Sequence, residues 1–451
     1  MQNSNRREFI KASAAAGASI VAVPAVAKEG GSPNDRVRLA IAGLGGRGRN
    51  SHMNALHQMA KENVEIVALC ECDEKRLEAS GAKHEKETGK KAVLYKDYRK
   101  LLEDKSIDAV TIAMPDHWHA LATIWACRAG KDVYCEKPVS HNISEGRKMV
   151  QAARKYKRIV QAGTQCRSSP NIREGIRKLH EGIIGRVYMA RGIAYKYRAG
   201  GKNEFGPVPP NLDWNYWQGP ASEKPYNRLA IYRWRFLKHY GSGEIGDQGV
   251  HQLDIIRWGL KMDTHPNWAQ AMGGKLFRPT SEVTTPGNLA FACQWEEPET
   301  QVMFETRDGF TNPEAGMGTQ YPFVDHRNVV GVIFLGTEGY MIIPDYSSYH
   351  TFLGRKRELG PTASTTGAPM MDLDHFQNWI GAVRGRKPSD LFAEIEEGHK
   401  SATLAHLANA AYRTRQTLQF DPQAERFLNS AEANKLLTRD YRAPFVVPDE
   451  V

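Results

Sequence analysis

Cysteine is scarce in this chain, and its spacing matches no metal motif. The 451 residues include six cysteines, at positions 70, 72, 127, 135, 166 and 293. None of the intervals between them has the spacing of a zinc site. We therefore expect free, mostly buried thiols and no bound metal. The weaker alternative is a metal site built from the histidines His117, His119, His239 and His251.

Long apolar runs and internal repeats are also missing. The most apolar stretch, residues 12–26, is interrupted by Pro24, and its roughly 15 residues are too few to cross a hydrocarbon core about 30 Å thick. With no repeat and an ordinary 41% of hydrophobic residues, a solenoid or a disordered chain is excluded. A chain of this length predicts two or three packed domains and no membrane span in the mature protein.

Charge of one sign is only slightly in excess. The 61 Lys and Arg residues exceed the 51 Asp and Glu residues by ten. The basic residues are scattered, and no recognition helix or zinc-finger pattern accompanies them. We therefore expect a solvated basic surface and no nucleic-acid partner.

The N-terminus carries an export pattern. Asn5-Arg6-Arg7-Glu8-Phe9-Ile10-Lys11 precedes the weakly apolar stretch, and Ala25-Val26-Ala27 provides small residues for cleavage. This predicts a twin-arginine signal at residues 1–27, a polar linker at 28–35 and a periplasmic location. An uncleaved anchor stays open as an alternative. Because this route exports folded proteins, it favours a protein that acquires its cofactor in the cytoplasm.

A dinucleotide-binding pattern follows the linker. The buried strand expected at Val37 to Ala42 leads directly into Gly43-Leu44-Gly45-Gly46-Arg47-Gly48. Glycines allow a tight turn and close approach of a pyrophosphate, and the helix expected near Arg47 would direct its N-terminal N–H groups at the phosphates. A second expected strand, Val64 to Cys70, ends at Glu71. A carboxylate there can bind the ribose hydroxyls and repel a 2′-phosphate, which favours NAD and leaves NADP as the alternative.

Two further strand ends supply polar residues. The strand expected at Asp108 to Ala113 ends in a segment containing Pro115 and His119, and the one at Asp132 to Cys135 ends at Glu136-Lys137-Pro138. Parallel sheets bind ligands at the carboxyl ends of their strands. Pro115, His119, Glu136 and Lys137 are therefore candidate cofactor-binding residues.

With Gly246-Asp247-Gln248-Gly249-Val250-His251 added to these motifs, the chain resembles the Gfo/Idh/MocA family (glucose-fructose oxidoreductase and inositol 2-dehydrogenase). The resemblance implies an α/β protein with a Rossmann domain, assigned here to residues 36–158. It also implies a C-terminal α/β domain with a large, open, mainly antiparallel sheet, at 159–420, and a homodimer or homotetramer. Residues 421–451 are expected to form a polar tail, with an arm around a neighbouring subunit as one interpretation.

The same resemblance places the catalytic residues at Lys137, Asp247 and His251. Independently, the spacing puts Asp247, His251, Asp254 and Trp258 on one helical face, although such a pair on an arbitrary helix is more often exposed or capping. We expect His251 to act as the base, because imidazole titrates near neutral pH. Asp247 would orient its ring and Lys137 would polarise the substrate oxygen. The reverse assignment of Lys137 and His251 stays open.

Aromatic residues are concentrated between Trp214 and Tyr240. Eight of these 27 positions are aromatic, where the overall 9% gives about two. Flat rings beside donors suit sugar binding, whereas a hydrophobic cluster under a loop is the alternative. The candidate substrate residues are Arg167, Trp234, Arg235, Asp247 and His251.

These patterns predict an exported NAD(P)-dependent oxidoreductase that acts on a secondary hydroxyl of a sugar, glycoside or polyol with a tightly held cofactor. One alternative is an NAD-dependent glycoside hydrolase or lyase that works through a transient keto-sugar. A second alternative is a non-catalytic sugar- or NAD-binding protein.

Overall fold

The computed structural model describes residues 36–198, 200–309, 328–365 and 371–451. The export signal and the linker expected from the sequence lie outside these ranges. None of the helices within them is both long and apolar enough to cross a membrane. All six cysteines are free, and all except the partly exposed Cys72 are buried, which confirms that expectation.

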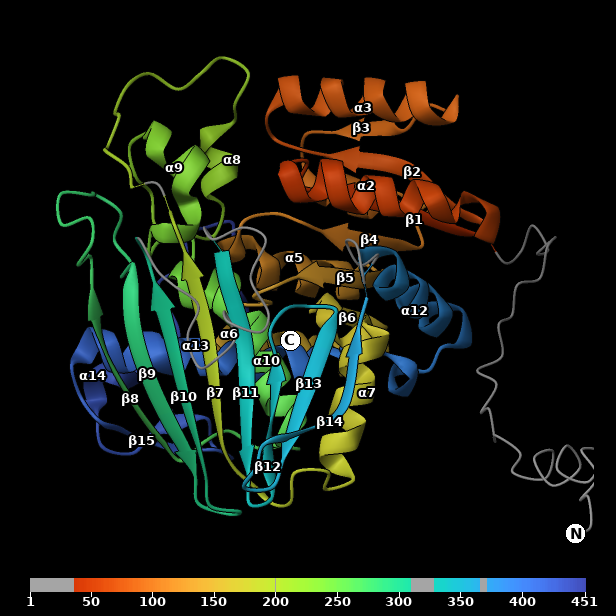
Figure 1. Ribbon diagram of the computed structural model, residues 1–451. Coiled ribbons are helices and arrows are strands. Elements are labelled where there is room, and N and C mark those ends of the chain that lie inside the picture. The colour runs from red at the N-terminus through yellow and green to blue at the C-terminus, as the bar shows by residue number, and fades with distance from the viewer. Residues whose placement is uncertain (1–35, 199, 310–327, 366–370) are drawn as a thin grey trace, which may run out of the picture.

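The first domain contains a six-stranded parallel sheet with the strand order β3-β2-β1-β4-β5-β6 (Figure 1). This is the order of a Rossmann fold, as expected. The last strand starts after residue 158, so the sheet extends beyond the expected domain boundary. The strands are β1 (Val37–Ala42), β2 (Val64–Cys70), β3 (Val93–Tyr95), β4 (Ala109–Ile112), β5 (Asp132–Glu136) and β6 (Val160–Gly163).

The helices of this domain follow the strands, and three of them begin with a polar side chain that caps the helix. Asp73, Asp97 and Asn142 each accept a hydrogen bond from a backbone N–H at the start of the helix that follows. Such caps satisfy N–H groups that the helix itself cannot pair. The helices are α2 (Met53–Gln58), α3 (Glu74–Thr88), α4 (Tyr98–Glu103), α5 (Asp116–Arg128) and α6 (Ile143–Lys155).

The second domain contains a ten-stranded sheet with the order β14-β13-β12-β11-β7-β10-β9-β8-β15-β16. Every neighbouring pair is antiparallel except β7 with β10, so the expected mainly antiparallel sheet is confirmed. The strands are β7 (Val187–Lys196), β8 (Trp268–Gly274), β9 (Asn288–Trp295), β10 (Thr300–Arg307), β11 (Asn328–Gly336), β12 (Gly339–Ile343), β13 (Ser348–Leu353), β14 (Glu358–Ser364), β15 (Leu418–Asp421) and β16 (Arg426–Phe427).

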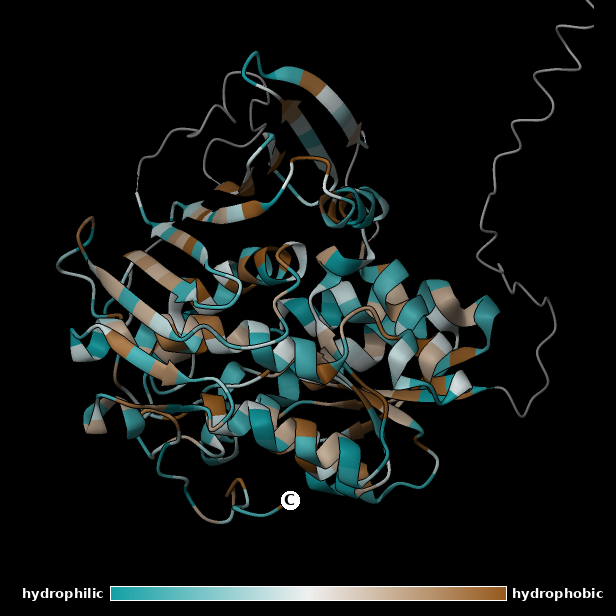
Figure 2. Ribbon diagram, turned by 90° about the horizontal axis from the view of Figure 1, so that it is seen from below, coloured by the Kyte–Doolittle hydropathy of each residue, from teal (hydrophilic) through white to brown (hydrophobic). Residues whose placement is uncertain are grey.

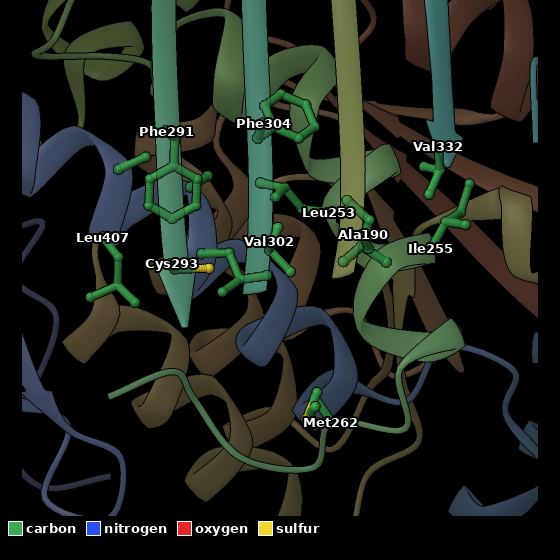
Figure 3. Packing of buried hydrophobic residues seen from close by; sticks show 14 of the residues in the cluster. Ala190, Leu253, Ile255, Met262, Phe291, Cys293, Val302, Phe304, Val332 and Leu407 are labelled. Carbon is green, nitrogen blue, oxygen red and sulfur yellow. The ribbon is translucent and has the colours of Figure 1, made fainter. Parts of the chain in front are cut away.

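One face of this sheet packs on helices and forms the main core. Alternate residues of β9 point inward, and Phe291 and Cys293 meet Leu407 and Leu253 from two helices (Figure 3). Alternation with period two is what a half-buried strand requires. The helices that follow β6 in the chain are α7 (Pro170–His180), α8 (Trp214–Gln218), α9 (Arg228–Arg233), α10 (Val250–Gly259), α12 (Met371–Gly385), α13 (Ile395–Thr414) and α14 (Ala431–Asn434). Of these, α7, α10, α13 and α14 contribute to this core.

Helix α12 belongs by packing to the first domain. Phe376 and Trp379 are fully buried in a cluster with Leu39 and Ile41 of β1, and Figure 1 shows the helix beside the first sheet. The expected second domain, 159–420, is therefore interrupted by a segment that covers the Rossmann sheet. Hydrophobic and hydrophilic residues alternate along the helices in Figure 2, as helices with one packed face require.

The C-terminal segment packs on its own chain, contrary to the expected arm around a neighbour. Phe445 and Val447 are buried in the core of the first domain. The Phe445 ring lies edge-on to Trp118 of α5, with 5.4 Å between ring centroids. Arg442 donates hydrogen bonds to the backbone oxygens of Asn215 and Gly219.

Replacing Phe445 with alanine should lower the free energy of unfolding by about 3–5 kcal/mol, because it leaves a cavity among aromatic rings. The neighbouring Val446, 46% exposed, provides the control: Val446→Ala should change stability by less than about 0.5 kcal/mol. Urea unfolding at two protein concentrations measures both. A Phe445→Ala loss that depends on protein concentration would point to packing on another subunit.

Candidate functional site

The glycine loop has the shape that a dinucleotide requires. Gly43 has a φ of +88°, and a Cβ there would lie 2.7 Å from the backbone of Ala113. A Cβ on Gly48 would lie 1.9 Å from the oxygen of Gly43. A Cβ on Gly45 or Gly46 would meet nothing within 4 Å. The outer glycines therefore allow the tight turn, and the inner ones leave space for a ligand.

A cavity of about 420 Å³ opens in front of this loop, within the size range of small-molecule sites. The segment from α8 through the short helix η5 (Trp234–Phe236) closes its other side. The structure thus brings together expected residues from both domains: Gly43, Leu44, Gly45, Gly46, Arg47, Glu71 and Pro115 with Trp234 and Arg235. Tyr216, Trp217 and Tyr232 also line it. The aromatic segment, residues 214–240, therefore forms one wall of this cavity.

Glu71 lines the cavity and also holds the glycine loop in place. One carboxylate oxygen accepts a hydrogen bond from the N–H of Leu44 at 2.9 Å, and the other accepts from Cys72 at 2.9 Å and from Asp73 at 3.2 Å. The position at the end of β2 fits the expected ribose contact. In this structure the carboxylate also fixes the conformation of the glycine loop.

Glu136 lies behind the loop and does not line the cavity, contrary to its expected cofactor contact. It is 3% exposed and accepts hydrogen bonds from Arg47 at 2.7 Å, from Gln165 at 3.1 Å and, when its Nε2 carries the proton, from His52 at 3.0 Å. Burial raises its pKa, but Arg47 and His52 lower it more, so the net shift is well below the usual range. Its role is to anchor Arg47, which also pairs with Asp372 of α12.

His119 also lies outside the cavity lining. Its two ring nitrogens face the backbone oxygens of Pro138, at 2.6 Å, and Met114, at 2.8 Å. Burial lowers its pKa. The ring connects the loops that follow β4 and β5, and so it positions Pro115 and Lys137 without contacting the cavity itself.

Lys137 and Asp247 meet at the junction of the domains. Lys137 follows β5, and Asp247 lies in a π-helical turn, η6 (Ile245–Gly249), directly before α10. The Lys137 Nζ lies 3.2 Å from one Asp247 oxygen and donates to its backbone oxygen. Arg235 and Arg198 also reach this carboxylate, each at 3.0 Å. Burial raises the pKa of Asp247, but Lys137, Arg235 and Arg198 lower it far more.

His251 is near this centre but has a different setting from the one expected. No hydrogen bond links it to Asp247 within the described residues, so the expected orientation of its ring by Asp247 is wrong. Its ring lies 5.7 Å from that of Tyr346, and Nδ1 is buried without a described partner. Burial and then Lys137 hold its pKa well below the usual range.

Arg167 and Asp254 form a buried ion pair away from the cavity. Nε and Nη2 of Arg167 each donate a hydrogen bond to an Asp254 oxygen at 2.8 Å, and Arg167 is 5% exposed. Ser401 of α13 also donates to Asp254 at 2.7 Å. The expected placement of Arg167 at the substrate is therefore wrong. The pair fixes α10 against α13.

Two charged residues near Asp247 were not found from the sequence. Lys196 ends β7, and Arg198 follows it and pairs with Glu244 at 2.7 Å. The signal was a pair of basic residues directly after the apolar run Ile193-Ala194-Tyr195. Neither belongs to the motifs that carried the family resemblance.

A histidine–glutamate cluster lies elsewhere. His265 and His399 place Nε2 at 2.8 and 2.7 Å from one Glu425 oxygen, and these three residues could hold a metal ion by proximity. Arg147 contacts the same carboxylate at 2.6 Å. Hydrogen bonds and this ion pair account for the cluster.

His117, from the alternative metal site considered in the sequence, is hydrogen-bonded within the protein. Its ring nitrogens face the backbone oxygens of Trp217 and Tyr240.

Comparison with known proteins identifies the family. Residues 37–164 match the Gfo/Idh/MocA oxidoreductase family's NAD-binding Rossmann fold. Residues 176–271 and 344–447 match its C-terminal alpha/beta domain. The chain belongs to the Gfo/Idh/MocA oxidoreductase family. This confirms the resemblance inferred from the motifs and the expected cofactor NAD.

Two relatives illustrate the distance within this family. Inositol 2-dehydrogenase 1 of Saccharopolyspora erythraea is 36% identical over 299 residues, which are 65% of this chain and 72% of that protein. Levoglucosan dehydrogenase of Pseudarthrobacter phenanthrenivorans is 30% identical over 163 residues, 36% of this chain. That match spans 35% of the relative's length.

Solved structures share the fold. A levoglucosan dehydrogenase in complex with NADH and levoglucosan aligns with a TM-score of 0.64 and 16% identity, covering 85% of this chain and 99% of that one. An aldose-aldose oxidoreductase from Caulobacter crescentus, complexed with glycerol, aligns with a TM-score of 0.62 and 17% identity, covering 85% and 100%.

Asp116, at the start of α5, gives a pH-dependent test of this site. Its carboxylate accepts hydrogen bonds from Ser242 at 3.2 Å, and burial raises its pKa to about 7. Between pH 4 and 7 the native carboxyl is protonated while the unfolded one is ionised, so its contribution to stability falls as the pH rises. Asp116→Asn should therefore gain roughly 2–4 kcal/mol relative to the parent protein between pH 4.5 and 8.

Denaturant unfolding at these two pH values measures the difference. Asp449→Asn, at a fully exposed position, is the matched control for loss of one carboxylate. A stability difference between Asp116→Asn and the parent that does not change with pH would contradict the assigned ionisation.

Proposed function

We propose that this protein is an NAD-dependent oxidoreductase that oxidises a secondary hydroxyl of a sugar, glycoside or polyol. The observation that carries the proposal is the Lys137–Asp247 pair, at 3.2 Å, which Arg235 connects to the glycine-loop cavity. The names of the relatives, an inositol 2-dehydrogenase and a levoglucosan dehydrogenase, support a polyhydroxylated substrate.

The cofactor fits the residues that line the cavity. Gly45 and Gly46 leave room for a pyrophosphate, Glu71 is placed for the adenosine ribose, and Trp234 and Arg235 lie at the far side. When bound, the nicotinamide ring supplies the acceptor of the hydride from the substrate carbon. The protein's own contribution is to bind the substrate hydroxyl and remove its proton.

Lys137 and His251 are the residues that we assign to this proton transfer. The Lys137 ammonium, held by Asp247, donates a hydrogen bond that stabilises negative charge developing on the substrate oxygen. His251 has a lowered pKa, so its ring is neutral and free to accept the proton. Its Nδ1 is buried without a hydrogen-bond partner among the described residues, and a substrate hydroxyl would supply one. A lowered pKa also makes this ring a weaker base than free imidazole.

The main alternative is an NAD-dependent glycoside hydrolase or lyase that uses the same residues. Oxidation would acidify the neighbouring carbon, elimination would release the aglycone, and, in the hydrolase, water would add to the unsaturated keto-sugar before reduction returned the electrons. Solvent deuterium at that carbon without net NADH would favour this alternative, whereas a stable keto-sugar favours the oxidoreductase. A non-catalytic binding protein is the third candidate, and turnover of any sugar excludes it.

Lys137→Met should reduce turnover by about 10²–10⁴-fold, because it removes the donor to the reacting oxygen. Dinucleotide affinity should change little, since Lys137 does not line the cavity in front of the glycine loop. The measurements are NADH formation with a polyol panel and fluorescence titration of NADH. Lys105→Met, at an exposed position, is the control. Undiminished turnover in Lys137→Met would remove this residue from the mechanism.

We further propose that residues 1–27 direct export through the twin-arginine route and that the cofactor is carried tightly bound. Free NAD would be scarce outside the cytoplasm, so a bound cofactor must be reoxidised within the same site. Changing Arg6 and Arg7 to lysine should shift the protein from the periplasmic to the cytoplasmic fraction, measured by immunoblot. Mass spectrometry of the denatured exported protein should detect NAD in a near-stoichiometric amount. An unchanged distribution would contradict the route, and a missing dinucleotide would contradict the tight binding.

A homo-oligomer, dimeric or tetrameric, remains part of this proposal. On the side of the ten-stranded sheet opposite the main core, Met272 of β8 and Met303 of β10 are exposed. Exposed apolar side chains on a sheet face suit contact with another copy of the chain. Light scattering of the purified protein decides the number of subunits.

A further inference from the structure

A small cavity beside the end of β7 is lined by four basic side chains. We call it the cationic cavity and define it by Lys196, Arg198, Lys275 and Arg278. Its free volume is about 30 Å³. Because one water molecule needs about 10–15 Å³ in this measure, the cavity holds two or three water-sized groups. That is room for a small polar group and not for a sugar ring.

The acids that line the cationic cavity are already paired. Glu244 pairs with Arg198 at 2.7 Å, and Asp308 pairs with Arg278 at 3.2 Å. Two positive charges therefore remain in excess among the lining residues.

The two lysines have only uncharged partners within the described parts of the chain. Lys196 donates to the side-chain oxygen of Gln248, and Lys275 donates to the backbone oxygen of Ser281 at 2.6 Å. Burial and then Arg198 lower the pKa of Lys196 to about 8. Burial and Arg198 therefore outweigh the nearby acids Glu244 and Asp247, which raise this pKa but form no ion pair with Lys196 among the described residues.

A third basic side chain also has an unused donor. The Nη2 of Arg278 is buried and has no hydrogen-bond partner among the described residues. Its guanidinium lies 4.8 Å from the ring centres of both Tyr197 and Phe277, so neighbouring rings fix its position. A buried donor without an acceptor is costly, and an oxygen anion in the cavity would satisfy it.

We propose that the cationic cavity binds the carboxylate of a sugar acid whose hydroxyl is oxidised at the Lys137–Asp247 pair. This inference rests on the proposed function and narrows its substrate class. Arg198 connects the two places: it lines the cavity and lies 3.0 Å from one oxygen of Asp247, whose other oxygen contacts Lys137. The two oxygens of a carboxylate match the free volume and can accept from Lys196 and Arg278.

The test compares sugar acids with their uncharged counterparts on the purified protein with bound NAD. D-glucuronate, D-galacturonate and D-gluconate are titrated beside D-glucose, D-galactose and D-glucitol by calorimetry. At least one acid should bind tenfold or more tightly than its counterpart, as a charged hydrogen bond implies. D-glucose 6-phosphate, titrated in parallel, distinguishes a phosphate site from a carboxylate site.

Lys196→Met should reduce this preference about tenfold, and Lys196→Arg should retain it. Lys356→Met, at an exposed turn position, should leave it unchanged, and NADH affinity reports an intact fold. Equal binding of all acids and their counterparts would overturn the inference. So would a preference that survives Lys196→Met combined with Lys275→Met, or tighter binding of the phosphate.

Failure of the proposed function gives a different result. If an acid binds with the expected preference but no compound is oxidised, the cavity assignment holds and the oxidoreductase activity does not. If polyols are oxidised without any preference for acids, the activity holds and the cavity assignment does not.

Discussion

The arrangement of the site depends on one buried carboxylate. Asp247 is bound by Lys137 from the end of β5, by Arg198 from the end of β7 and by Arg235 from the aromatic segment. Removing charges from water is costly unless close partners compensate, so the three cations and the carboxylate stabilise one another only when all three segments are in place. The contact therefore couples the Rossmann sheet, the second sheet and the wall of the cavity.

The cavity wall has a second support behind it. Trp118 and Tyr216 line the cavity, and the ring of Phe445 packs edge-on against both, with centroids 5.4 and 5.6 Å away. Residues at the end of the chain thus determine the position of side chains beside the glycine loop. This explains why a segment without any chemistry of its own is well packed: it holds the aromatic segment against α5.

The parts of the site that could be predicted are those fixed by backbone topology. Strands that run parallel bring their carboxyl ends to one edge, so Gly43, Glu71, Pro115 and Lys137 could be placed near each other from strand patterns alone. The pairing of Lys137 with Asp247 could be anticipated only from the family resemblance, because 110 residues separate them.

The parts that could not be predicted depend on burial and on the choice of partner. Glu136, His119 and Arg167 are polar residues at or near strand ends, just as ligand-binding residues are, yet each is buried with protein partners. Residue type and spacing do not show which way a side chain points. The spacing of Asp247 and His251 predicts one face of a regular helix. Asp247 instead lies in the π-helical turn η6, and its carboxylate contacts three cations.

The ionisation states in this centre follow from the count of cations around each acid. Asp247 has three close cations, and its pKa falls despite burial. Glu244 has Arg198 alone within ion-pair distance among the described residues, and burial leaves its pKa raised. Among the described residues, Asp116 has Ser242 as its only hydrogen-bond partner, and its pKa rises to about 7. Burial raises the pKa of all three carboxyl groups, and the number of cations nearby decides whether the net shift is downward or upward. For the cation Lys196 the signs are reversed: burial and Arg198 lower its pKa more than Glu244 and Asp247 raise it.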